Sequence, residues 1–181
     1  MALLRWRSQF AVGLALVLAM PGAVPAHTAN EYEVKAAFLF NFTRFVDWPA
    51  SLGRGPFCIG IEGADPFGGA LEEVVKGRTA GGHAIAVKHF NAGEETAACE
   101  IVFISGADSK KLRAALGRLQ RAAVLTVGEG RDFCHSGGVI AFEVEDNKVR
   151  LDINPEAAQR AHLQISSKLL ALATLVRDGG E

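Results

Sequence analysis

The sequence predicts an α/β protein built on a single mixed β-sheet with helices on both faces of the sheet. The first observation is a pair of almost unbroken apolar runs, at residues 99–105 and 122–127, which are typical of strands covered on both faces. The second is a pair of strand patterns at 137–144 and 148–153, joined by the turn-forming residues 145–147, which predicts an antiparallel hairpin. The third is the alternation of these strands with amphipathic helical patterns.

The first half of the chain predicts a helix, a strand, a second helix and a second strand. These elements are expected at residues 31–48, 57–63, 67–76 and 83–90. The first helix is expected to end at Trp48, because a residue before proline disfavours the helical region. Asp65 suits the N-cap of the second helix and Pro66 its first helical position, so we assign Asp65 to capping in preference to catalysis.

The second half of the chain predicts strands that alternate with helices and ends in a long helix. These elements are expected at residues 99–105, 108–121, 122–127, 137–144, 148–153 and 154–177. Residues 129–136 are polar and predict a loop. Asn154 and Pro155 suit the cap and the first turn of the last helix, whose apolar face extends from Ala158 to Val176.

The N-terminal residues have the pattern of a signal peptide. Arg5 and Arg7 precede a short apolar run, which is well below the roughly 20 residues needed to span a bilayer. Small residues favour cleavage after Ala26, so residues 1–26 are expected to be removed and residues 27–181 to form one domain in the periplasm. An N-terminal anchor that stays uncleaved is the alternative interpretation.

Composition and cysteine spacing exclude several kinds of site. The chain has a net charge of −1 and its basic residues are scattered, so no nucleic acid is expected as a partner. The three cysteines, Cys58, Cys99 and Cys134, allow at most one internal disulfide. No two of them have the close spacing of a zinc site, and neither a metal nor a cofactor is predicted.

The sequence shows no catalytic signature, so no catalytic residue is predicted and the chain is not expected to be an enzyme. It contains no nucleophile elbow, phosphate-binding loop or paired-histidine zinc motif. His83 and His89 have an even spacing on one strand, and we favour surface positions over a metal pair. Ser166, Ser167 and Lys168 are adjacent on a helical pattern, so their side chains diverge by about 100° instead of facing each other.

The first helix carries more large apolar side chains than one buried stripe requires. Phe38 belongs to an apolar ridge, and Leu39 and Phe40 lie beside it. Uncovered apolar surface usually marks an interface, and large aromatic side chains often anchor binding. We therefore expect Phe38, Leu39 and Phe40, together with Leu169 of the last helix, to contact a partner. The alternative is that all of these side chains belong to the core.

An ordered set of seven segments covers nearly the whole chain after residue 26. The segments are residues 32–42, 45–49, 65–68, 99–104, 137–142, 149–154 and 165–170. In this order they resemble the YfiR family of periplasmic repressors of membrane-bound diguanylate cyclases. The resemblance implies a periplasmic regulator, expected to be a homodimer. It also implies that the regulator represses a membrane-bound receptor such as a diguanylate cyclase through the receptor's periplasmic sensing domain.

The same resemblance implies a pairing of the cysteines. YfiR-like repressors can carry two disulfides, and Cys58 and Cys99 match the first pair. Cys134 matches one half of the second pair, but the position expected for its partner holds Ala141. A disulfide between Cys58 and Cys99 is therefore expected, and Cys134 is left over.

A small-molecule-binding protein that acts as a ligand sensor is the second hypothesis. Its ligand is expected at strand ends near residues 63–69, with Asp65 and Phe67 as ligand-binding residues. An envelope hydrolase is a third and more distant hypothesis. Thermal stabilisation by a metabolite would favour the sensor, whereas a complex with a receptor's periplasmic domain would favour the repressor.

Overall fold

The computed structural model describes residues 26–49 and 55–179, so the predicted signal peptide lies outside the described residues except for Ala26. The helices in these ranges are α1 (Ala26–Phe45), α2 (Ala70–Val75), α3 (Ser109–Leu119), α4 (Arg131–His135), α5 (Pro155–Arg160) and α6 (Ser167–Leu170). The strands are β1 (Val46–Asp47), β2 (Phe57–Glu62), β3 (Thr79–Ala80), β4 (His83–Phe90), β5 (Ile101–Ile104), β6 (Leu125–Glu129), β7 (Ile140–Glu145), β8 (Lys148–Ile153), β9 (Gln164–Ile165) and β10 (Thr174–Leu175).

Most of the described strands join one mixed sheet, in the order β10-β8-β7-β6-β5-β2-β4-β3. The central strands from β4 to β7 run parallel, whereas β8 pairs antiparallel with β7 and β3 pairs antiparallel with β4. β1 and β9 form a separate antiparallel pair, in which Val46 lies opposite Ile165. This arrangement confirms the predicted mixed sheet and its antiparallel hairpin, β7–β8.

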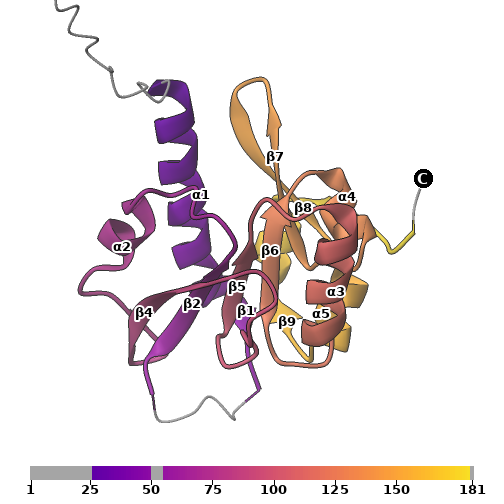
Figure 1. Ribbon diagram of the computed structural model, residues 1–181, viewed down its shortest axis with the longest axis horizontal. Coiled ribbons are helices and arrows are strands. Elements are labelled where there is room, and N and C mark those ends of the chain that lie inside the picture. The colour runs from indigo at the N-terminus through magenta and orange to yellow at the C-terminus, as the bar shows by residue number, and fades with distance from the viewer. Residues whose placement is uncertain (1–25, 50–54, 180–181) are drawn as a thin grey trace, which may run out of the picture.

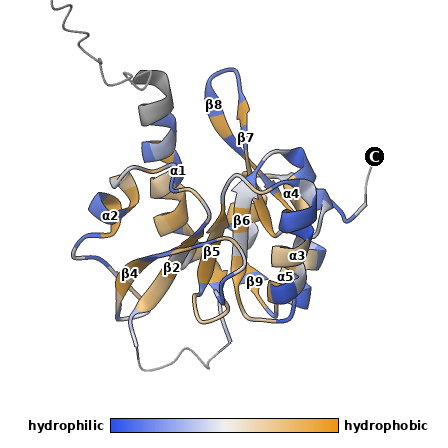
Figure 2. Ribbon diagram, viewed as in Figure 1, coloured by the Kyte–Doolittle hydropathy of each residue, from blue (hydrophilic) through white to orange (hydrophobic). Residues whose placement is uncertain are grey.

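Helices cover both faces of the sheet, as predicted (Figure 1). α1, α2, α5 and α6 contribute to one apolar core together with the strand side chains that point the same way. α3 and α4 pack against the opposite face, around Cys58, Val102, Ile104 and Ala141. Figure 2 shows the consequence for polarity, because the central strands are apolar whereas hydrophilic residues gather on the outer turns of the helices.

Aromatic packing joins α1 to the centre of the sheet. Phe42 of α1 stacks on Phe142 of β7, with the ring centroids 6.1 Å apart. Phe103 of β5 contacts Phe142 at 6.4 Å and Phe67 at 5.0 Å between centroids. Aromatic pairs of this kind stabilise a core beyond the burial of their apolar area, so α1 is held firmly over the strands.

The prediction of one helix over residues 154–177 is wrong beyond its first turns. Asn154 does cap α5, by accepting the N–H of Ala157, but α5 ends at Arg160 and His162 has a positive φ of 58°. The chain then pairs β9 with β1, forms the short α6 and adds β10 beside β8. Pairing with distant strands supplies hydrogen-bond partners for the backbone N–H and C=O groups of this segment. It therefore overrides the helical spacing of the apolar residues.

The start of α2 also differs from the prediction. α2 begins at Ala70 instead of residue 67, because Gly68 and Gly69 adopt positive φ values of 56° and 91° and keep the preceding residues in a turn. Asp65 accepts the Phe67 N–H at 2.8 Å within that turn. Asp65 is therefore a turn residue, and the expectation that it caps the helix is wrong.

The predicted loop over residues 129–136 contains a short helix, α4. Phe133 on this helix is buried between Gly128 and Gly138, at which an added Cβ would lie within 2.2 Å of its ring. Only glycines at these two positions leave room for the ring, so α4 can pack directly on the sheet.

Candidate functional site

α1 and the β7–β8 hairpin project from the same end of the molecule (Figure 1). Their side chains line a groove between them. We call it the α1–hairpin groove. It has a volume of about 350 Å³ and is lined by Asn30, Glu31, Val34, Phe38, Val144, Asn147, Lys148 and Val149. One wall therefore comes from the start of the described chain and the other from a hairpin near its end.

The walls of the α1–hairpin groove expose apolar side chains. Val34 on α1 is 39% exposed and Val144 on β7 is 43% exposed. Over residues 30–49 and 55–179, the other large apolar side chains with such exposure are Leu172 and Leu175, near the sheet edge formed by β10. Polar residues surround the two valines, and an apolar centre with a polar rim is the usual anatomy of a protein interface.

A buried lysine fixes α1 beside the end of β6. Lys35 is almost fully buried, and its ammonium pairs with Glu31 of α1 and with Glu129 of β6. Tyr32 donates a hydrogen bond of 3.3 Å to Glu129, and its ring centroid lies 4.5 Å from the Lys35 ammonium. Burial lowers the pKa of Lys35, but its hydrogen bonds to the two carboxylates outweigh burial and raise the pKa above its ordinary value. Lys35 stays charged and holds the α1 wall in place.

The hairpin carries two carboxyl groups on the side opposite Val144. Burial, followed by the charge of Asp152, raises the pKa of Glu143, and the Glu143 Oε1 atom is buried without a hydrogen-bond partner. Burial is also the main cause of a raised pKa at Asp152. Asp152 lies opposite Ala141 in the β7–β8 register, two residues from Glu143. The charge of Asp152 therefore disfavours the ionisation of Glu143.

The predicted partner-binding residues lie in two environments. Phe38 is half-buried and lines the α1–hairpin groove. Leu39, Phe40 and Leu169 are buried in the core, so the expectation that they form an uncovered apolar surface is wrong. The physical reason is the path of the chain after α5, because β9 pairs with the strand that follows α1 and brings α6 into the same core.

Sequence reasoning did not identify Val34 and Val144 as the exposed apolar residues. Val34 precedes Phe38 by one helical turn, and this spacing was the available signal on α1. Val144 alternates with Glu143 and Glu145, which indicates that it faces the other side of the hairpin but not what it faces. The groove itself depends on the placement of α1 beside the hairpin, which local patterns do not contain.

The residues predicted to bind a ligand lie in different surroundings. Phe67 is buried and packs edge-on against Tyr32, with the ring centroids 5.6 Å apart. Phe67 also lines a broad hollow of about 1050 Å³ between α1 and α2. Asp65 is exposed, and its carboxylate is engaged with the Phe67 N–H. Ligand binding by these two residues remains a prediction.

One cluster of side chains has the chemistry of a cation site. Asp65, Glu72 and His89 offer ligand atoms that all lie within 4.8 Å of one another. His89 Nε2 lies 3.0 Å from Glu72 Oε1, and His89 Nδ1 lies 4.0 Å from Asp65 Oδ2. The cluster is largely exposed, and exposed acidic groups are common without a metal. His83 instead contacts the Gly55 carbonyl at 2.9 Å, so the two histidines of β4 do not converge.

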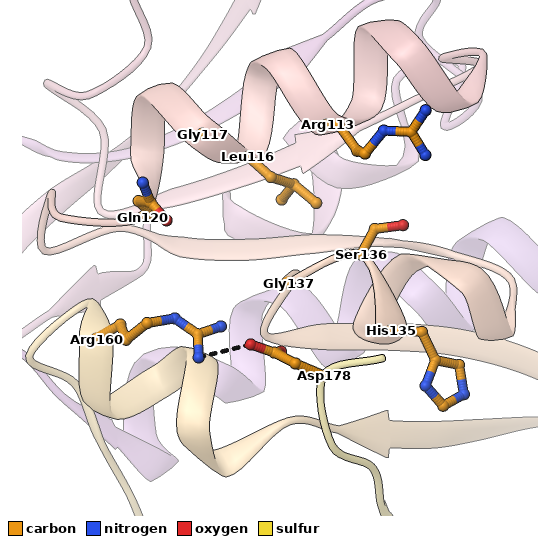
Figure 3. A pocket seen from close by; sticks show the side chains of 9 residues that line it. All are labelled: Arg113, Leu116, Gly117, Gln120, His135, Ser136, Gly137, Arg160 and Asp178. Carbon is orange, nitrogen blue, oxygen red and sulfur yellow. Dashed lines mark ion pairs between the residues drawn. The ribbon is translucent and has the colours of Figure 1, made fainter. Parts of the chain in front are cut away.

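A polar cleft of about 460 Å³ lies between α3, the end of α4, α5 and the segment after β10. Figure 3 shows Arg160 reaching towards Asp178, with which it forms an ion pair of 2.7 Å. Arg113 of α3 and Gln120, directly after α3, line the opposite side of the cleft, while His135 points away from the Arg160–Asp178 pair. The Arg160 charge is therefore already neutralised by a residue of the cleft itself.

The predicted disulfide between Cys58 and Cys99 is present, with the two Cα atoms 4.5 Å apart. It forms because β2 and β5 are neighbours in the sheet. Cys134 is the free cysteine of the described chain, and it is buried in the same cluster as Ala141. Burial, followed by the charge of Asp152, raises the pKa of the Cys134 thiol to about 12, so the thiol stays protonated.

Comparison with known proteins places the chain in a family. Within the described residues, none of the helices is both long and apolar enough to span a membrane. No curated protein gives a significant match to the chain. A family model described as YfiR/HmsC-like matches residues 32–174, a range that includes Val34, Phe38 and Val144 of the α1–hairpin groove. The protein therefore belongs to the YfiR/HmsC-like family.

Proposed function

We propose that this protein is a periplasmic regulator that represses a membrane-bound diguanylate cyclase by binding the periplasmic sensing domain of the cyclase. Membership of the YfiR/HmsC-like family supports the function, and the export pattern of residues 1–26 supports the compartment. The observation that carries the proposal is the α1–hairpin groove, in which Val34 and Val144 stay exposed on facing walls.

The α1–hairpin groove accepts an apolar side chain of the receptor between α1 and β7. Val34, Phe38, Val144 and Val149 supply the apolar contacts, and desolvated contacts of this kind at the centre of an interface carry most of its binding energy. Glu31 and Lys148 place opposite charges at the rim of the groove. Rim charges steer a partner and fix its register more than they add affinity.

The lining of the groove supports binding instead of catalysis. It combines asparagine, valine and phenylalanine side chains with one glutamate and one lysine. Glu31 is paired with the buried Lys35, so the carboxylate of this lining is not free to act as a general base. We therefore propose a regulatory protein that is not an enzyme.

We further propose that the protein is a homodimer through the β10 edge of its sheet. β10 is an edge strand of the sheet, and Leu172 before it and Leu175 within it are 75% and 59% exposed. An open strand edge with apolar side chains tends to pair with another chain. Antiparallel pairing of β10 with β10 of a second copy is self-complementary around a two-fold axis. Such a dimer leaves both α1–hairpin grooves available to the receptor.

Titration calorimetry with the periplasmic domains of the membrane-bound diguanylate cyclases from the same organism tests the proposed function. Val34→Glu or Val144→Glu places a charge in the apolar contact, and each variant should weaken the complex at least about tenfold. Both side chains are exposed, so the melting temperature should change little. The matched control is Leu172→Glu, which adds the same charge at the β10 edge and should give a monomer by light scattering that still binds.

Three results would overturn these proposals. If both valine variants bind as tightly as the wild-type protein, or if Leu172→Glu alone abolishes binding, the receptor does not use the α1–hairpin groove. If the wild-type protein binds none of the cyclase domains, the proposed function is wrong.

A further inference from the structure

A second pocket lies where the order of the parallel strands reverses. The chain leaves β2 through α2 and enters β4 on one side of β2, and it then returns to form β5 on the other side. In an open sheet with parallel strands, ligands bind outside the carboxyl ends of the strands at such a reversal. The carboxyl ends of β2 and β5 are therefore the place where the fold predicts a ligand.

The structure has a pocket of about 410 Å³ at this place, which we call the switch-point pocket. Its lining includes Glu62 at the end of β2, Gly63 after it, Ser105 and Gly106 after β5, and Lys111 and Arg118 of α3. Most of its other lining residues are alanines and glycines, which have no side chains long enough to fill the space. Pockets of about 300–1,000 Å³ with an apolar lining and a few polar groups are typical small-molecule sites.

A buried carboxylate gives the switch-point pocket a fixed wall. Glu62 is buried, and its side chain accepts hydrogen bonds from the Gly93 N–H at 2.9 Å and from Arg118 Nη2 at 2.8 Å. Thr96 donates a weaker hydrogen bond to it at 3.4 Å. These contacts neutralise Glu62 and tie the loop after β4 and the helix α3 to the end of β2. The wall is therefore formed without a ligand.

The two strand ends approach each other too closely for a side chain at Gly63. Gly63 has a positive φ of 100°, and a Cβ added there would lie 2.5 Å from the Ser105 carbonyl oxygen. Ser105 in turn donates its N–H to the Glu62 carbonyl at 2.9 Å. The floor of the pocket is thus bare backbone, which allows a flat ligand to lie against it.

The charges at the mouth of the pocket favour an anionic group. Lys111 and Arg118 are seven residues apart on α3, so they lie on the same face of the helix. Arg118 forms an ion pair with the buried Glu62. Lys111 pairs with Asp108 at 3.3 Å, and because this pair is exposed it costs little free energy to break. Lys111 is therefore the cation that can move to meet a ligand.

We propose that the protein binds a small aromatic carboxylate in the switch-point pocket, with the ring against the alanine and glycine wall and the carboxylate facing Lys111. This site lies apart from the α1–hairpin groove, and the inference does not depend on the proposed receptor. Its failure would leave cyclase binding untouched, because the two tests use different variants and different ligands.

Titration calorimetry with 2-naphthoate, and with its neutral analogue 2-naphthamide, tests the site. We expect 2-naphthoate to bind and 2-naphthamide to bind at least about fivefold more weakly. Lys111→Glu should weaken the binding of 2-naphthoate at least about fivefold, and Ala114→Phe, which fills the pocket from the exposed surface of α3, should abolish it. The matched control is Lys110→Glu, at an exposed neighbour outside this lining, which should leave binding unchanged.

The proposal is overturned if 2-naphthoate does not bind at up to about 5 mM, a limit that corresponds to very weak affinity. It is also overturned if acid and amide bind equally, or if Lys110→Glu weakens binding as much as Lys111→Glu. Retained binding by an Ala114→Phe protein whose melting temperature is unchanged would place the ligand elsewhere and overturn the site.

Discussion

Glu143 shows how one side chain of the hairpin couples the fold to pH. Burial and the Asp152 charge raise its pKa, and its buried Oε1 atom has no hydrogen-bond partner. The Glu143 carboxyl therefore binds its proton more tightly in the folded protein than in the unfolded chain. Ionisation of this side chain consequently destabilises the fold. This cost is absent below the ordinary pKa of 4.5, grows as the pH rises through the raised pKa, and is complete above it.

Glu143→Gln removes the charge and keeps the shape, so it should increase the free energy of unfolding at pH 7. The gain should shrink as the pH falls to about 4, where the wild-type carboxyl is mostly protonated in both states. Urea denaturation at the two pH values measures the difference. Glu145→Gln is the matched control, because Glu145 is exposed and forms a surface ion pair with Arg131 at 2.9 Å. A gain of equal size at both pH values would contradict the account.

At the scale of elements, β2 and β5 are joined by a parallel ladder and also by the Cys58–Cys99 bridge. The bridge spans a sequence separation of 41 residues, so it removes much conformational freedom from the unfolded chain. Replacing both cysteines by serine should lower the free energy of unfolding by about 3–4 kcal/mol. Urea denaturation with and without a reductant measures this loss, and the double variant should no longer respond to the reductant.

Peptide mapping without a reductant is the control for this pairing. It should recover a Cys58–Cys99 peptide and leave Cys134 as a thiol, because Cys134 is buried and its pKa is raised to about 12 by that burial and by the charge of Asp152. A bridge that includes Cys134 as the main species would contradict the structure.

Elements with strong local signals were predictable from the sequence. The buried runs became β5 and β6, and the turn at Asp146 and Asn147 became the tip of the β7–β8 hairpin, where both residues have positive φ. The segment after α5 was not predictable, because the spacing of its apolar residues fits a helix as well as it fits packing on two separate surfaces. Only the pairing of β9 with β1 and of β10 with β8 decides between them.

The candidate site could be predicted only in part, for a similar reason. Phe38, predicted to contact a partner, is half-buried and lines the α1–hairpin groove, and its contact with a partner remains a prediction. Leu39 and Phe40 are buried instead of exposed because the C-terminal segment, expected to be one long helix, packs α5 and α6 into the same core as α1. Val34 and Val144 line the groove from distant parts of the chain, and no local sequence pattern shows that they lie on the same groove.

At the scale of the whole molecule, three surfaces lie on different elements. The α1–hairpin groove lies between α1 and β7–β8, the switch-point pocket lies between β2, β5 and α3, and the exposed leucines lie beside β10. The sheet connects all three, since β7, β5 and β10 belong to it. The three surfaces have no residue in common, so each can be altered without changing the residues of the other two.

Repression of a diguanylate cyclase through the α1–hairpin groove is tested by measuring cyclic di-GMP in living cells. The measurement compares a strain that lacks this protein with the same strain carrying the wild-type protein or the Val34→Glu, Val144→Glu double variant. We expect the wild-type protein to lower cyclic di-GMP and the double variant to leave it at the level of the deletion strain, although immunoblots find equal amounts of both proteins in the periplasm. Equal repression by the two proteins would contradict the role of the groove, and no repression by the wild-type protein would contradict the function itself.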